Sequence, residues 1–147
     1  MAKFSTGLRN GMLSNTGLSE ALNGGFLKIF SAPTIPATAD AAETGTLLMT
    51  LTGGGDGTTG LEFDAPANGI LGKSPTQVWM TSAIDNAGTC AYFRFVGQSD
   101  DGTYSETAPR IQGTVGLAGA DMNLTNTLVS AGAPWTLNYF NIGLPTV

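Results

Sequence analysis

The chain contains no histidine. Histidine is the commonest general base, the usual activator of serine and cysteine nucleophiles, and the commonest metal ligand. The carboxylates that remain could supply acid–base chemistry of the kind used by glycoside hydrolases, with candidates at Glu62 and Asp64, at Asp100 and Asp101, and at Glu106. Each of them lies in a predicted hairpin or turn, where solvated acidic side chains are expected. We therefore predict that the protein is not an enzyme and has no cofactor.

Cysteine is almost absent as well: Cys90 is the single one, so no disulfide can form within the chain. We predict that it is a buried small hydrophobic residue. A zinc site would depend on this thiol and on carboxylates, which is a poor ligand set. Asp56, Glu62 and Asp64 could gather around a calcium ion, but they lack the spacing of an EF-hand loop. We predict no metal site, and calcium binding by these three carboxylates stays open.

Charged residues make up 12% of the chain, about half the usual fraction. The formal net charge is −5 and the isoelectric point is about 4.3, which argues against nucleic acid as a partner. The few positive charges concentrate near the start, where Lys3, Arg9 and Lys28 outnumber Glu20 within residues 1–30. A basic segment on an acidic body indicates that the two contact different surfaces.

Long hydrophobic runs are missing too. No stretch approaches the length of a transmembrane helix, and residues 1–30 lack the continuous apolar region of a signal peptide. We expect a protein that is made in a cytoplasm and has no membrane partner.

The strongest pattern in the chain lies between Gly88 and Gly97. Ala91, Phe93 and Phe95 alternate with Tyr92, Arg94 and Val96, which predicts a strand with one apolar face and one mixed, outer face. Similar short strands are predicted at 25–31, 46–52, 61–64, 70–73, 77–84, 110–116, 121–125, 127–130 and 135–144. Strands without intervening helices pair antiparallel, so we predict an all-β fold of about eight to ten short strands: a β-sandwich, a jelly roll or a small barrel.

Residues 1–24 differ from the rest of the chain. Apolar residues recur at helical spacing at Phe4, Leu8 and Met12, and again at Leu18 and Leu22. We predict that this segment is an N-terminal arm with a short helix and that residues 25–147 form the β-sandwich domain. The arm either covers an open end of the β-body or reaches a neighbouring subunit.

Within the arm, Thr16 or Ser19 is expected to cap a short helix that closes at Asn23-Gly24. Near the other end of the chain, Trp135 and Tyr139 follow a Gly132-Ala-Pro134 turn and belong either to the core or to a contact between subunits. The candidate interface residues are therefore Phe4, Leu8, Arg9, Met12, Leu13, Leu18, Trp135 and Tyr139.

Five stretches of the sequence stand out together: Phe4-Ser-Thr-Gly-Leu-Arg-Asn10, Gly25-Phe-Leu-Lys-Ile-Phe30, Ala39-Asp-Ala-Ala-Glu-Thr-Gly-Thr-Leu-Leu48, Tyr92-Phe-Arg-Phe95 and Arg110-Ile-Gln-Gly-Thr-Val-Gly116. They resemble small virion structural proteins of tailed bacteriophages. Within that group, the size, the basic arm and the β-body are most similar to a capsid decoration (cement) protein. The resemblance implies a homo-oligomer, typically a trimer, on the capsid surface of the virion, with arms that contact the major capsid protein. It supplies no binding motif that can be assigned to individual residues.

The same resemblance leaves a second role open, as a component of the tail or of a fibre. In that role the protein would be a binding module for glycans of the host surface, with Trp79, Trp135 or Tyr139 as platforms on which sugars stack.

Overall fold

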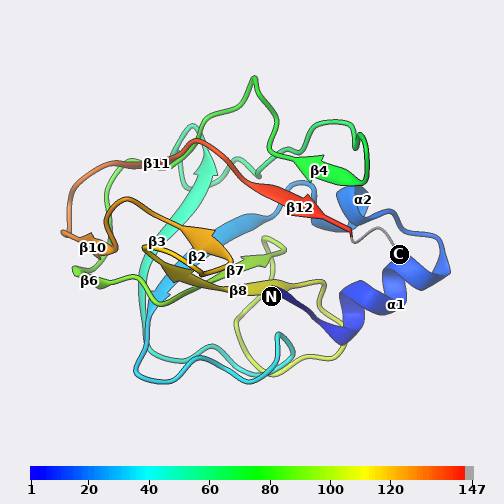
Figure 1. Cartoon of the computed structure of the whole chain (residues 1–147), viewed down its shortest axis with the longest axis horizontal. Coiled ribbons are helices and arrows are strands. Elements are labelled where there is room, and N and C mark those ends of the chain that lie inside the picture. Colours follow the sequence, from blue (N-terminus) through cyan, green and yellow to red (C-terminus); the bar gives the residue numbers. More distant parts are fainter. Residues whose placement is uncertain (145–147) are drawn as a thin grey trace.

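The structure is a computed structural model, and it describes residues 1–144. Its main sheet has eight strands, in the order β1-β8-β7-β2-β3-β5-β11, with β9 added beside β8 (Figure 1). These strands are β1 (Lys3–Phe4), β2 (Phe26–Ser31), β3 (Thr46–Gly53), β5 (Trp79–Thr81), β7 (Tyr92–Val96), β8 (Ile111–Gly116), β9 (Met122–Asn123) and β11 (Trp135–Leu137). The pairings are antiparallel, except that β9 runs parallel to β8.

Two smaller sheets and two helices complete the described residues. One sheet pairs β4 (Ile70–Gly72) with β12 (Asn141–Gly143), and the other pairs β6 (Gly88–Thr89) with β10 (Leu128–Val129). The helices are α1 (Thr6–Ser14) and α2 (Leu18–Leu22). An all-β fold with antiparallel sheets and short helices near the N-terminus is thus confirmed. Neither helix is long and apolar enough to cross a membrane, and residues 1–144 contain no other helix.

One predicted hairpin is wrong. Residues 61–64 do not pair with β3: Leu61 forms a bridge with Gly25, and Phe63 forms one with Lys73. The edge of β3 that this hairpin would need is paired with β5, where Gly53 lies opposite Trp79. Because that edge is already hydrogen-bonded, the chain that follows the glycine-rich loop of residues 53–60 bonds to other segments.

The inner face of the main sheet carries an aromatic core. Phe95 is fully buried and Phe93 is 3% exposed, as the alternation predicts. The Trp79 ring packs beside them, with ring centroids 5.9 Å from Phe95 and 5.5 Å from Phe140, and Phe63 packs edge-on against Trp79 at 5.3 Å. Phe93 and Phe95 also contact Phe140 directly, at 5.7 and 6.1 Å. Each of these rings removes a large apolar area from water, so the cluster contributes strongly to the hydrophobic stabilisation of the fold.

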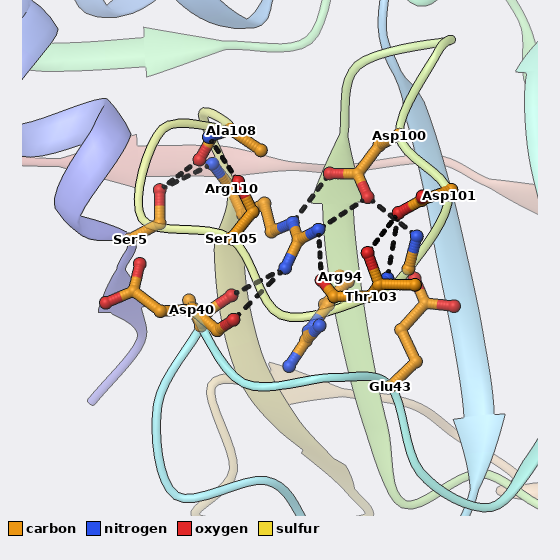
Figure 2. Close-up of polar contacts among 12 residues, drawn as sticks. Ser5, Asp40, Glu43, Arg94, Asp100, Asp101, Thr103, Ser105, Ala108 and Arg110 are labelled. Carbon is orange, nitrogen blue, oxygen red and sulfur yellow. Dashed lines mark hydrogen bonds and ion pairs between the residues drawn. The ribbon is translucent and has the colours of Figure 1, made fainter.

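The opposite face of β7 is not an exposed outer face, as the sequence suggested. Tyr92, Arg94 and Val96 are all buried, and Arg94 is fully so. The reason is a pair of loops, residues 32–45 and 97–110, that lie across this side of the sheet (Figure 2). Alternation along one strand shows that two faces differ, but it carries no information on whether a distant loop covers the polar one.

The loop of residues 32–45 is tied down by polar side chains that project from the sheet. The Tyr92 hydroxyl donates to the carbonyl of Thr44 (2.8 Å), and Gln112 donates to the carbonyl of Pro36 (2.7 Å). Lys28 forms an ion pair with Glu43 at 3.1 Å. These bonds hold an irregular, proline-containing segment in one conformation.

The N-terminal residues are also packed on the β-body. β1 pairs with β8, and Leu8 and Leu22 are core residues, 0% and 2% exposed. The boundary between the N-terminal arm and the β-domain at residues 24 and 25 stays a prediction. Residues before and after this boundary pack in the same hydrophobic core. The helix cap expected at Thr16 or Ser19 is wrong: Gly17 is the N-cap of α2 and no side chain bonds there, whereas the helix closes at Asn23-Gly24 as expected.

Ser5 joins the start of α1 to the end of the loop 97–110. Its buried hydroxyl accepts hydrogen bonds from the backbone N–H groups of Leu8 (3.1 Å) and Arg110 (2.8 Å) and donates to the carbonyl of Ala108 (2.8 Å). One side chain therefore caps the helix and fastens it to the body.

Replacing Ser5 with alanine is expected to lower the free energy of unfolding by about 2 kcal/mol, because two backbone donors are left without an acceptor. Chemical denaturation measures this change. Ser14→Ala is the matched control, since the Ser14 hydroxyl is exposed and only donates to the carbonyl of Gly11. Equal effects of the two substitutions would contradict the role of Ser5.

Candidate assembly interface

Three of the carboxylates considered for catalysis, Asp100, Asp101 and Glu106, are engaged in structural contacts. Asp101 accepts hydrogen bonds from Thr103, and Glu106 accepts one from the Tyr104 hydroxyl. Asp100 forms a buried ion pair with Arg110. Each contact lies within or beside the loop 97–110, so these acids hold that loop in shape.

The three carboxylates considered for calcium do not come together. Within residues 1–144 no group of three or more histidine, cysteine, aspartate or glutamate side chains is placed to hold a metal ion. Asp56 accepts hydrogen bonds from its neighbours instead. The side chain of Thr59, then the backbone N–H groups of Thr59 and Thr58, lower the pKa of the Asp56 carboxyl to about 2. The Asp56 carboxylate thus stabilises the turn of residues 56–59.

Asp100 and Arg110 form the centre of a polar cluster under the covering loops (Figure 2). Arg110 Nε lies 2.6 Å from one carboxylate oxygen of Asp100 and Nη2 lies 2.7 Å from the other, so the pair is bidentate. The Arg110 side chain is 1% exposed and that of Asp100 is 3% exposed. Burial raises the pKa of Asp100, but the hydrogen bonds from Arg110 and from the backbone of Gly102, with the charge of Arg110, outweigh it and hold the pKa below its usual range.

Arg94 lies in the same layer without a carboxylate partner. Its Nε and Nη2 atoms donate to Gln112 Oε1 at 2.9 and 2.7 Å, and Nη2 also lies 3.3 Å from the carbonyl of Thr38. Nη1 has no hydrogen-bond partner among the described residues. Burial lowers the pKa of this guanidinium. The contacts of the cluster hold the two loops on the sheet.

An apolar groove of about 700 Å³ lies on the other side of the sheet. Phe93, Ile111 and Phe140, which belong to the core, form its floor. One wall is formed by the start of the chain and β9, and the other by residues from Leu137 to Leu144. The groove therefore opens directly onto the hydrophobic core.

A second groove, of about 340 Å³, adjoins the first. It lies between the helices α1 and α2 and the small sheet of β4 and β12. Both grooves are lined by Ile142 and Leu144, so they meet along β12. Together they give this side of the molecule one hollowed, mainly apolar face, which we call the β12 face.

Most of the contact residues expected from the sequence lie on the β12 face. Phe4, Arg9 and Tyr139 line the larger groove, and Met12 and Leu18 line the smaller one. The Tyr139 side chain is 83% exposed.

The other three expected contact residues lie elsewhere. Leu8 is fully buried in the core beneath α1, so it is not presented to a partner. Leu13 is 85% exposed on α1 but lines neither groove. Trp135 is partly buried and packs against the core, and a contact of its exposed part with another subunit stays a prediction.

Sequence reasoning missed the residues in and beside β12 that line the grooves: Ile142 and Leu144 line both, and Phe140 lines the larger one. Phe140, Ile142 and Leu144 alternate with polar or small residues, which predicts a half-buried strand but not a groove on both of its sides. The sequence does contain one signal for an exposed face here: Tyr139 and Asn141 alternate with the apolar residues, which puts an aromatic and a polar side chain on the exposed side of the same strand.

Comparison with protein-family models, with curated protein sequences and with solved structures found no match. A function is therefore proposed from the residues of this chain and from the resemblance described above.

Proposed function

We propose that the protein is a structural component of an assembly, which binds its partner through the β12 face. In particular, we propose a capsid decoration (cement) protein of a tailed bacteriophage, which lies on the surface of the virion head and stabilises it by bridging subunits of the major capsid protein. The partners under this proposal are the major capsid protein and further copies of the chain in a trimer.

The observation that carries the proposal is the gathering of expected contact residues on one apolar face. Phe4 and Tyr139 come from opposite ends of the chain and line the same groove. The exposed ring of Tyr139 is an anchor of the type that dominates protein–protein interfaces, where aromatic residues surrounded by apolar contacts contribute most of the binding energy. A groove that opens onto the core is also a surface whose burial by a partner removes apolar area from water.

The finer architecture is proposed on the same ground. The main sheet ends at β1, the small sheet ends at β12, and the larger groove separates these two edges. This arrangement favours a small, incompletely closed barrel over a sandwich of two full sheets.

Electron cryo-microscopy of virions tests the proposal directly, and copies of the protein are expected on the head. Density confined to the tail would contradict the decoration role and favour the alternative of a tail component that binds host glycans. For that alternative Trp79 is no longer a candidate platform because it is fully buried, which leaves Tyr139 and the partly buried Trp135.

Tyr139→Ala is expected to weaken binding to undecorated capsids by roughly tenfold or more, since loss of an interface anchor costs about 2 kcal/mol. Sedimentation of the protein with capsids at several concentrations measures the affinity. Tyr104→Ala is the control, because Tyr104 is also an exposed tyrosine (63%) but belongs to the loop 97–110. Loss of binding in the control alone would place the interface on the loop side.

A further inference from the structure

We infer that the larger groove receives an extended segment of a partner chain, which adds as a β-strand between β1 and β12 and carries a carboxylate that meets Arg9. The inference deepens the proposed function, and it rests on that function only in naming the partner as a capsid subunit.

The backbone of β12 points hydrogen-bonding groups at the groove that have no backbone partner within residues 1–144. Lys73 N–H donates to the Phe140 carbonyl at 2.8 Å, and Leu144 N–H donates to the Gly69 carbonyl at 2.9 Å. In an antiparallel ladder, hydrogen-bonded and non-bonded pairs alternate. Asn141 and Gly143 therefore stand at non-bonded positions toward β4, and their N–H and C=O groups face the opposite edge, where both residues line the groove.

The same reasoning applies to β1 on the other wall. Ser5 N–H donates to the Arg110 carbonyl at 2.9 Å, so the pair next to it, Phe4 with Ile111, is non-bonded. The N–H and C=O groups of Phe4 accordingly face away from β8, and Phe4 lines the groove. β1 and β12 are not paired with each other. Two strand edges with free backbone groups thus border one apolar floor.

An extended chain satisfies all of these groups at once. Strand addition supplies main-chain hydrogen bonds to an open edge, and alternate side chains of the added strand enter the pockets beneath it. Here those side chains meet Phe93 and Phe140, so apolar residues are required at alternate positions. The added strand would cover a large opening to the core.

Charge sets one further property of the segment. Arg9 lines the groove, is exposed, and has no ion pair within residues 1–144; its Nη2 donates only to the Thr6 hydroxyl at 3.0 Å. The other charges at the groove, the terminal amine of Met1 and the carboxylate of Asp121, pair with each other at 3.0 Å. The free charge is therefore positive, and a carboxylate on the added strand complements it.

A second copy of this chain is the less suitable occupant. Every strand in residues 1–144 is already paired with a neighbour, so a copy has no free strand to donate.

The test uses a short synthetic peptide of alternating threonine and valine that ends in aspartate, and a second peptide that ends in lysine. The wild-type protein is expected to bind the aspartate peptide about fivefold more tightly, as one exposed ion pair allows. Arg9→Glu should abolish or reverse that preference. Lys3→Glu makes the same change of charge at an exposed lysine that bonds the Ala37 carbonyl outside the groove, and should keep the preference.

A second pair of variants tests whether the peptide forms backbone hydrogen bonds with β12. Gly143→Pro removes the N–H that faces the groove, whereas Gly143→Ala keeps it and has open space around the new Cβ. Binding of the aspartate peptide should fall in the first and persist in the second. Hydrogen exchange should slow at the amides of Phe4 and Gly143 when the peptide is bound.

The outcomes distinguish strand addition in the groove from the proposed capsid role. Capsid binding without any peptide binding, and without slowed exchange at Phe4 and Gly143 on the capsid, overturns strand addition and leaves the proposed function in place. Peptide binding in the groove without capsid binding supports strand addition and overturns the capsid role. Slowed exchange at these amides with rising concentration of the protein alone identifies a second copy as the occupant and overturns the inference.

Discussion

Asp100→Asn is expected to lower the free energy of unfolding by about 3–5 kcal/mol at neutral pH, because it leaves the Arg110 guanidinium buried without a counter-charge. The two side chains are almost fully buried and bonded at two points, so little water reaches the pair. Arg110 also donates to the carbonyl of Thr103 (2.8 Å), a neutral acceptor that does not replace a carboxylate. A loss of this size is a large part of the stability of an ordinary domain.

The neighbouring acid provides the matched control. Asp101 is exposed and its carboxylate bonds only to Thr103 within the same turn. Asp101→Asn makes the same chemical change one residue away and should have a much smaller effect. Urea denaturation of the three proteins compares them, and similar midpoints for Asp100→Asn and the wild type would show that the buried pair is dispensable.

The effect of Asp100→Asn depends on pH in a defined direction. The folded protein holds the pKa of Asp100 below its usual range. The folded state therefore binds the proton less readily than the unfolded state, so the stabilisation is fully present above the ordinary pKa of aspartate, about 3.9. It is lost as the pH falls through the lower, folded-state value. The difference in stability between wild type and Asp100→Asn should be constant near neutrality and shrink in acid.

The sequence predicts local features of this fold well. Alternation finds β2, β3, β7 and β8, and it assigns Phe93 and Phe95 to the core, because side chains on a strand change faces at every residue whatever the strand packs against. The predicted burial of Cys90 is also confirmed, because a free cysteine commonly behaves as a small hydrophobic residue. Burial also raises the pKa of its thiol to about 11.

What the sequence does not predict depends on contacts between distant residues. Arg94 is expected on an outer face, but it is buried because the carbonyl of Thr38 and the side chain of Gln112 surround it. The β12 face cannot be predicted from the sequence for the same reason. Phe4 and Tyr139 are recognisable as candidates, but their meeting in one groove depends on which edges β1 and β12 leave free. Such information lies in the pairing of strands and not in any one stretch of chain.

Helix α1 offers the second large effect, because two of its glycines stand in opposite surroundings. A Cβ on Gly7 would overlap the backbone carbonyl of Thr107, whereas a Cβ on Gly11 would meet only the side chain of Thr16 at 3.8 Å. Glycine in a helix is destabilising by about 0.5–1 kcal/mol relative to alanine. Gly11→Ala should therefore stabilise the protein by that amount.

Gly7→Ala is expected to destabilise the protein by about 3 kcal/mol, because the atom it meets belongs to the backbone and cannot turn aside as a side chain can. The helix must shift as a whole, and that shift disturbs the buried Leu8 and the hydrogen bonds of Ser5. Arg9 follows on the same turn and lines the groove, so the variant should also bind partners more weakly below its unfolding transition. Thermal unfolding and capsid sedimentation of both alanine variants measure the two effects. If Gly7→Ala is stabilising like Gly11→Ala, then α1 is not held against the body and behaves as an independent arm.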